Sequence, residues 1–283
     1  MSKFILTGFA DEIDSNFKNQ LYGLNELGIQ YIEIRGVDGK NISKLSKNDV
    51  IEVRNQLSDF GIQVSSIGSP IGKIHIHEDF NSHLESFKHV IETAHTLSSP
   101  FIRIFSFYIP SGEDPALYRD EIMTRLGIIL EIAKGSGITI LHENESHIYG
   151  DNAERCLDIM KTMKTDHFAC AFDPANFIQC GTEVFPKALD MLRPYIKYVH
   201  IKDAIQDGRV VPAGIGVGRI EEVLSCLQAD GYQGFLSLEP HLGKFKELAK
   251  YEYPEWRGML KEDGGLQRFH IAFTALQNIL NRI

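Results

Sequence analysis

The chain has 283 residues, of which 43% are hydrophobic and 24% charged, an ordinary globular composition in a chain long enough to bury a large core. Its formal net charge of −9 argues against general affinity for nucleic acids or anionic membranes, because both favour a basic surface. An acidic total still permits a local basic pocket for an acidic or phosphorylated substrate.

The first 14 residues carry one lysine and a short apolar run followed by acidic residues, which is unlike a secretory signal. No stretch approaches the roughly 18–20 apolar residues of a membrane span. The four cysteines lack the CxxC spacing of metal and redox sites, and they are typical of buried thiols in a reducing compartment. We therefore expect a soluble, cytoplasmic protein.

Eight short apolar runs rich in strand-forming residues recur along the chain, at 4–10, 31–36, 63–69, 101–108, 139–145, 168–173, 197–203 and 235–240. Amphipathic segments with helical spacing lie between them, such as 83–97 and 121–137. Glycines precede several of the runs, as in 26–30 and 59–63, where a left-handed residue commonly ends a helix. The pattern is therefore one of alternating strands and helices.

Eight such alternations predict parallel strands, because each returning strand needs a crossover helix. The number of strands and the chain length favour a single (β/α)8 TIM barrel domain over residues 1–283. An open doubly wound sheet is the alternative, but no GxGxxG motif follows the first run. The segment 243–265 is longer than an ordinary connection between the eighth strand and its helix, and it predicts a lid or a contact in a possible homodimer, followed by a last helix at 266–283.

Four polar residues end the last four apolar runs: Glu143, Asp173, His200 and Glu239. They are separated by 30, 27 and 39 residues, about one strand-plus-helix unit each. The active site of a barrel lies at the carboxyl ends of its strands, so the four side chains are expected to meet at one mouth. The alternative is that they belong to separate surface ion pairs with lysine or arginine.

A buried cluster of three carboxylates needs charge compensation, which a divalent cation supplies. Carboxylate oxygens with one imidazole suit Mn²⁺ best, and Mg²⁺, Zn²⁺ or Co²⁺ are alternatives. The sequence therefore predicts one divalent metal ion as the cofactor.

The strings that carry these residues, HEN, FDPAN, HIKD and LEP, resemble the xylose isomerase-like TIM-barrel superfamily, which includes sugar-phosphate isomerases, ketose 3-epimerases and inosose dehydratases. The resemblance runs through essentially the whole chain. It implies that one divalent metal is held by Glu143, Asp173, His200 and Glu239. It also implies that Glu143 and Glu239 act as the catalytic acid/base pair of the epimerase branch.

The chain departs from this family at two places in the expected substrate shell. Asn176 stands where relatives often have histidine, and Glu145 stands where many read histidine. Both departures bear on the identity of the sugar more than on the metal. The missing histidine at Asn176 and the acidic net charge also argue against the apurinic endonucleases of the same superfamily, because DNA binding favours lysine and arginine.

Six residues are candidates for binding the substrate: Asn176, Lys202, Glu145, Arg103, Lys73 and His75. Because side chains alternate along a strand, Glu145 shares the face of Glu143, and Lys202 shares the face of His200. A salt bridge from Lys202 to Asp203 or Glu239 is an equal alternative. Arg103, like Glu33 or Arg35 in the second run, could line the pocket, but charged pairs commonly brace barrel interiors, and bracing is the favoured interpretation for these residues.

A metal chelated by a carbonyl and a neighbouring hydroxyl would acidify the C–H bond between them. One carboxylate would remove that proton, and a second would return it from the other face or to the adjacent carbon. We therefore expect a sugar or sugar-phosphate isomerase or epimerase that works through a metal-stabilised enediolate on a small carbohydrate. A metal-dependent keto-sugar or inosose dehydratase and a non-catalytic metal- or sugar-binding barrel are the alternatives.

The run 211–220 contains Gly214, Gly216 and Gly218. Their backbone N–H groups have two interpretations: a phosphate cradle, or a close turn into a helix that starts near 219–222. The turn is favoured, because no Lys-Ser/Thr pair follows the glycines.

Overall fold

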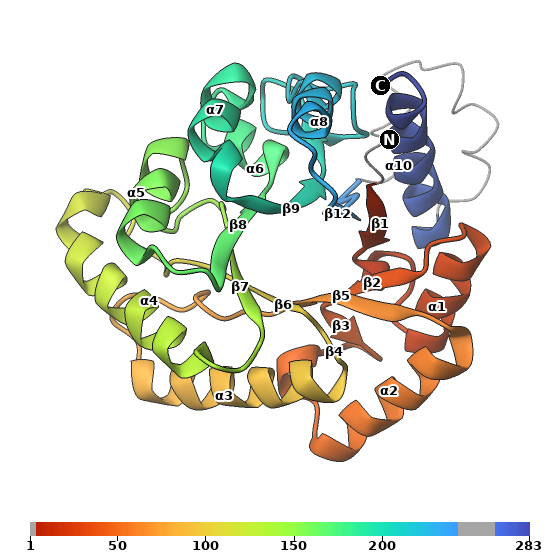
Figure 1. The fold of residues 1–283 in the computed structure, drawn as a ribbon, viewed down its shortest axis with the longest axis horizontal. Coiled ribbons are helices and arrows are strands. Elements are labelled where there is room, and N and C mark those ends of the chain that lie inside the picture. The colour runs from red at the N-terminus through yellow and green to blue at the C-terminus, as the bar shows by residue number, and fades with distance from the viewer. Residues whose placement is uncertain (1–3, 243–263) are drawn as a thin grey trace.

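The computed structural model of the protein describes residues 4–242 and 264–283. Eight parallel strands form an inner ring, and helices surround it (Figure 1). The strands are β1 (Ile5–Gly8), β2 (Tyr31–Ile34), β5 (Gln63–Gly68), β6 (Phe101–Ile104), β7 (Thr139–Glu143), β8 (Phe168–Phe172), β9 (Ile196–Ile201) and β12 (Phe235–Leu238). Each one falls on a predicted apolar run.

The strands pair in the order β1-β12-β9-β8-β7-β6-β5-β2, and every ladder in this sheet is parallel. The two end strands, β1 and β2, lie next to each other, so the barrel is nearly closed. The predicted (β/α)8 TIM barrel is therefore confirmed, and the open doubly wound sheet is excluded.

The main helices are α1 (Phe17–Glu26), α2 (Lys47–Phe60), α3 (Phe80–Thr96), α4 (Arg119–Ala133), α5 (Ala153–Met163), α6 (Pro174–Gln179), α7 (Leu189–Leu192), α8 (Ile220–Ala229) and α10 (Gly265–Leu280). Their ends follow local chemistry. A capping box between Ser46 and Asp49 starts α2, and Gly61 ends it in the left-handed conformation at φ 66°.

Two small antiparallel pairs extend the barrel: β3 (Gly36–Val37) with β4 (Lys40–Asn41), and β10 (Asp203–Ala204) with β11 (Val210–Val211). Some strands are shorter than the predicted runs. After β6 the chain leaves the sheet, because the amides of Phe105 and Phe107 donate to Ile71 and Gly72 in the preceding loop. Backbone hydrogen bonds to this loop therefore make the strand shorter than the predicted run 101–108.

The barrel interior holds its own apolar cluster, separate from the larger core between strands and helices: Leu141, Ala169, Ala171, Tyr198 and Phe235. Ala169 and Ala171 both point inward, as the alternation of side chains along a strand requires. This cluster forms the floor beneath the carboxyl ends of the strands.

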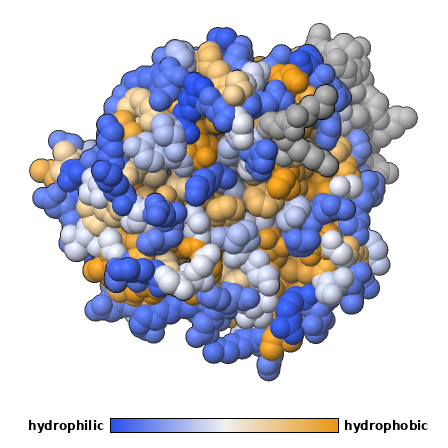
Figure 2. Space-filling view, in the orientation of Figure 1, coloured by the Kyte–Doolittle hydropathy of each residue, from blue (hydrophilic) through white to orange (hydrophobic). Residues whose placement is uncertain are grey.

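The helices present a largely hydrophilic periphery, with hydrophobic residues between them and nearer the centre (Figure 2). None of the helices in the described part of the chain is long and apolar enough to cross a membrane. The predicted lid or subunit contact at 243–265 lies almost entirely outside the described residues, so it stays a prediction, as does the homodimer. The last helix, α10, begins within one residue of its predicted start.

Candidate metal centre

The four strand-end residues meet at one point of the barrel mouth. Glu143 ends β7, His200 lies near the end of β9, and Asp173 and Glu239 directly follow β8 and β12. All four are at least 96% buried, and each offers one ligand atom within 4.8 Å of the others. The alternative of four separate surface ion pairs is therefore wrong.

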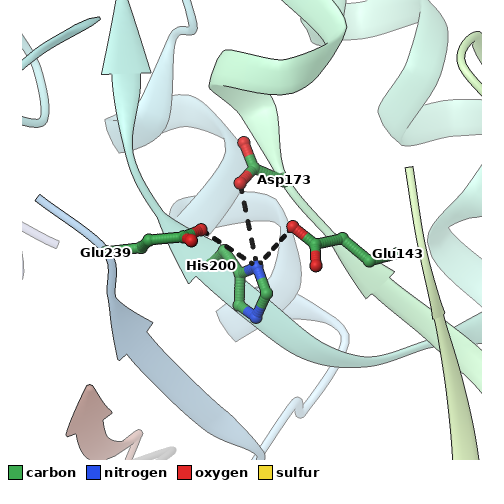
Figure 3. Close-up of side chains that lie close together, drawn as sticks. All are labelled: Glu143, Asp173, His200 and Glu239. Atoms are coloured by element: carbon green, nitrogen blue, oxygen red, sulfur yellow. Dashed lines mark hydrogen bonds and ion pairs between the residues drawn. The ribbon is translucent and has the colours of Figure 1, made fainter. Parts of the chain in front are cut away.

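The ring of His200 is central to this cluster (Figure 3). Its Nδ1 atom lies 3.0 Å from Oε1 of Glu143, 3.5 Å from Oε2 of Glu239 and 3.7 Å from Oδ2 of Asp173. Glu143 and Glu239 approach from opposite sides in this view, and Asp173 approaches from a third direction. One nitrogen and three oxygens thus converge on a small volume.

The donor set fits a divalent cation. Oε2 of Glu143 and Oδ2 of Asp173 are buried and accept no hydrogen bond, although each lies near a cationic side chain. Buried oxygens with unused lone pairs are costly unless a cation takes them. Three carboxylates and one imidazole are the ligand types that Mn²⁺, Mg²⁺ and Zn²⁺ accept.

The charges of the cluster depend on one another. Burial opposes ionisation of Glu143, but the charges of His200 and Arg103 lower its pKa to about 2. Burial likewise opposes ionisation of Glu239, and Lys202 outweighs it to hold the pKa of Glu239 well below its usual value. Against its own burial, the pKa of His200 is raised well above 6.5, chiefly by Glu143. Without a metal, the imidazolium is therefore the cation that the carboxylates surround.

Lys202 lies between two of the carboxylates, and two arginines lie near the glutamates. Lys202 Nζ lies 3.0 Å from Oδ2 of Asp173 and 3.1 Å from Oε2 of Glu239. Of the two salt bridges expected for this lysine, the one to Glu239 is confirmed and the one to Asp203 is wrong, because the Asp203 carboxylate accepts backbone amides instead.

Arginine side chains form ion pairs with the two glutamates, as expected if charged pairs brace the barrel interior. Arg103 Nη1 lies 3.0 Å from Oε2 of Glu143. Arg35 donates to Oε1 of Glu239 at 3.0 Å and also makes two hydrogen bonds to Asp11. The low pKa of Glu143 follows in part from this bracing.

Two asparagines hold the backbone of the site. The side chain of Asn144 donates to the carbonyl of Asp173 and accepts from its amide, both at 2.9 Å. Asn176, expected in the substrate shell, is 97% buried, and its side chain donates to Oε1 of Glu143 at 3.2 Å. Asn144 was not among the residues predicted from the sequence, although its position directly after Glu143 was an available signal.

The candidate substrate residues on the loops lie farther out. Lys73 Nζ donates to Oε2 of Glu145 at 2.9 Å and sits 4.2 Å over the ring of Phe105. Both charged side chains stay partly exposed. The ring of His75 stacks on His77 with centroids 6.0 Å apart.

A second group of ionisable side chains at the barrel mouth consists of Glu12, Glu239 and His241. Glu12 and His241 were not among the site residues predicted from the sequence. His241 Nε2 lies 3.3 Å from Oε1 of Glu12 and 3.4 Å from Oε1 of Glu239, and its backbone amide donates to Oε2 of Glu12 at 2.7 Å. His241 adopts a left-handed backbone at φ 41°. Glu12 reaches this group from the loop after β1, where no sequence pattern marked it.

The glycine loop before α8 binds a carboxylate of the chain itself. The amides of Gly214 and Gly216 each donate to Oδ2 of Asp203 at 3.0 Å, and Gly218 donates to Oδ1 at 2.9 Å. The phosphate interpretation is therefore wrong for these amides, and the turn into the helix at Ile220 is confirmed.

A family model described as "Xylose isomerase-like TIM barrel" matches residues 22–261. No curated protein matches the chain. Solved structures share the fold at low identity. One is the "IOLI protein with a binding zinc atom", at TM-score 0.78 and 17% identity with 99% of each chain covered.

Two further structures are similar over the whole chain. The probable 3-DHS dehydratase AsbF of Bacillus anthracis gives a TM-score of 0.73 at 17% identity, covering 99% of this chain and 100% of that one. The 3-keto-D-glucoside 4-epimerase YcjR of E. coli gives 0.68 at 16% identity, with the same coverage. From its family model and its barrel, the chain belongs to the xylose isomerase-like TIM-barrel family.

Proposed function

We propose that the protein is a divalent-metal-dependent isomerase or epimerase of a small carbohydrate, and that Glu143 and Glu239 transfer the proton. Family membership supports an enzyme of the isomerase type. The observation that carries the proposal is the placement of the two glutamates on opposite sides of one buried group of metal ligands (Figure 3).

Glu143, Asp173, His200 and Glu239 would hold the metal. When bound, a divalent ion there would act as a Lewis acid that polarises a substrate carbonyl and makes the neighbouring C–H more acidic. Mn²⁺ suits the oxygen-rich donor set best. Mg²⁺, Zn²⁺ and Co²⁺ are alternatives, because each accepts some of the same ligands.

The two glutamates then have distinct tasks. Both stay ionised across neutral pH, because His200, Arg103 and Lys202 lower their pKa values against the effect of burial. One carboxylate removes the proton from the substrate carbon and later releases it to solvent, whereas the other, on the opposite side, takes up a proton from solvent and delivers it to the substrate. Return to the same carbon inverts it, whereas return to the adjacent carbon converts an aldose and a ketose into each other.

The cationic side chains and the loops would hold the substrate. Lys202, at the metal ligands themselves, would stabilise negative charge that develops on a substrate oxygen. Arg103 and Asn176 would fix the carboxylate of Glu143, which both contact. The Lys73–Glu145 pair, together with His75, lies on the loops and offers donors and acceptors for sugar hydroxyls.

A dehydratase of a keto-sugar is the second candidate, because a similar structure is that of a probable 3-DHS dehydratase. Its first step is the same proton abstraction beside a carbonyl, followed by loss of a hydroxyl group. Lys202 is placed where a cation would assist that loss, within 3.1 Å of a metal-ligand carboxylate.

Incubation in D₂O tests the proposal and separates the two candidates. Ketoses and keto-inositols are incubated with the Mn²⁺-loaded protein, and the products are analysed by mass spectrometry and, after metal removal, by NMR. An isomerase or epimerase incorporates deuterium without losing water, a dehydratase loses water, and a binding protein does neither.

Replacement of either glutamate, Glu143→Gln or Glu239→Gln, should lower the exchange rate by about 10²–10⁴-fold, as expected for removal of a general acid/base. Glu154→Gln is a matched control, because Glu154 lies on the outside of α5 in an ion pair with Lys187. Exchange at the wild-type rate in both site variants would contradict the assignment.

A further inference from the structure

Glu33 lies directly beneath the candidate metal centre, on the inner face of β2. Its side chain is fully buried. Oε2 accepts a hydrogen bond from Ser237 Oγ at 2.7 Å and lies 3.2 Å from Nε2 of His200. Among the described residues, His200 is the only side chain that can carry a positive charge within ion-pair distance of this carboxylate, and the hydroxyl of Tyr198 also lies close to it.

The two nitrogens of His200 therefore face different partners. Nδ1 faces the three carboxylates of the metal centre, and Nε2 faces Glu33. An imidazole that binds a metal through one nitrogen is neutral and keeps its proton on the other. In this ring Nε2 is buried and makes no hydrogen bond of good geometry, and the carboxylate that lies 3.2 Å from it, that of Glu33, is not one of the ligands.

Packing restricts the ring to this orientation. Phe9 and Tyr198 contact the imidazole edge to face, with centroids 5.3 and 5.8 Å away. Ser237, which holds Oε2 of Glu33, is the residue paired with His200 in the β9–β12 ladder. The histidine, its packing partners and its acceptor thus belong to one rigid part of the barrel.

We infer that Glu33 is a positioning residue that accepts the Nε2–H of His200 and thereby presents Nδ1 to the metal. A carboxylate behind a metal-binding imidazole raises the basicity of the ligand and fixes its tautomer, and its loss typically weakens metal affinity by about 10–100-fold. Glu33 does this from a strand that contributes no ligand of its own. The inference rests on the metal site of the proposed function.

The bracing alternative for Glu33 makes a different prediction. A carboxylate that only braces the barrel would need a lysine or arginine partner, yet Arg35 and Arg103 pair with Glu239 and Glu143 instead. Loss of such a brace would lower the stability of the fold and leave the affinity of the folded protein for metal unchanged.

Mn²⁺ titration calorimetry on folded protein distinguishes the two roles. We expect Glu33→Gln, which keeps the shape and removes the charge, to weaken Mn²⁺ binding by about 10-fold or more. Thr7→Val is the matched control, because the hydroxyl of Thr7 is buried in the same interior and hydrogen-bonds Ser65, with no hydrogen bond to Glu33, His200 or Tyr198. It should leave the affinity within about threefold while removing a buried hydrogen bond.

Histidine-labelled protein loaded with Zn²⁺ gives a second readout. Nitrogen NMR should show His200 protonated at Nε2 and bound through Nδ1, with the signal assigned by its absence in His200→Asn. Ligation through Nε2, or equal Mn²⁺ affinity of Glu33→Gln and wild type, would overturn the inference alone. Absence of metal binding by the wild-type protein would overturn the proposed function and this inference together.

Discussion

Asn144 shows how one side chain can set the geometry of the site. It makes two hydrogen bonds to the backbone of Asp173 and is itself fully buried. Asp173 in turn caps α6, where its side chain accepts from the amide of Asn176 at 2.9 Å. The position of one candidate metal ligand therefore depends on a residue that is not itself a candidate ligand.

Replacement of Asn144 by alanine should leave the buried amide of Asp173 without a partner, and its carbonyl with only the 3.4 Å hydrogen bond from the amide of Phe177. We expect the free energy of unfolding of the metal-free protein to fall by about 2–4 kcal/mol, measured by urea denaturation. Asn25→Ala, which removes one exposed hydrogen bond to the carbonyl of Phe60, should change it by less than about 0.5 kcal/mol. Equal losses in the two variants would show that Asn144 has no special role.

Metal binding should release a proton from His200. In the metal-free protein Glu143 and Glu33 raise the pKa of this histidine above 6.5 against its burial, so the ring is protonated at neutral pH. A metal requires the neutral ring. The affinity of the protein for metal should therefore increase as the pH rises toward the raised pKa of His200, and decrease as the pH falls. Titration calorimetry in buffers of different ionisation enthalpy should give about one proton released per metal at pH 7; a value near zero would contradict it.

At the scale of elements, the loop between β10 and α8 is organised by one buried carboxylate. Asp203 accepts the amides of Ala204, Gly214, Gly216 and Gly218. Asp203 directly follows Lys202, so the packing of this loop also positions a cation of the site. Glycine at 216 is required, because a Cβ there would lie 2.2 Å from the Ala204 carbonyl oxygen and 2.3 Å from Oδ1 of Asp203.

Gly216→Ala should therefore lower the free energy of unfolding by about 1–3 kcal/mol or more, as overpacking does in a close contact. Gly127→Ala gives the matched control with the opposite sign. Gly127 lies within α4 and a Cβ there meets nothing within 4 Å, so alanine should stabilise the helix by about 0.5–1 kcal/mol. Thermal and urea denaturation of both variants would test this; no loss of stability in Gly216→Ala would refute the account of the loop.

At the scale of the whole molecule, periodicity and spacing were enough to predict the barrel and the meeting of four ligand candidates. The eight strands follow from apolar runs, and the site follows from the position of Glu143, Asp173, His200 and Glu239 at their ends. What the sequence could not provide was the contacts between distant segments, since those depend on how the barrel closes.

Glu33, Arg35 and Glu12 illustrate this limit. They come from the first two strand–helix units, yet they contact residues about 170 to 230 positions later in the chain. The Gly214–Gly218 loop is a second case: its amides suit an anion, and only the fold identifies that anion as the carboxylate of Asp203. Local pattern predicts donors and acceptors, whereas tertiary structure pairs them.

The central claim is that these four strand-end residues bind one divalent ion. Metal analysis of protein dialysed after Mn²⁺ loading tests it most directly, with Asp173→Asn as the partner variant, since it keeps the size of the side chain and removes one charge. We predict about one Mn²⁺ per wild-type chain, in line with one cluster of four ligands, and a large loss of bound metal in the variant at unchanged circular dichroism. A metal-free wild type, or an equal metal content in the two proteins, would contradict the account.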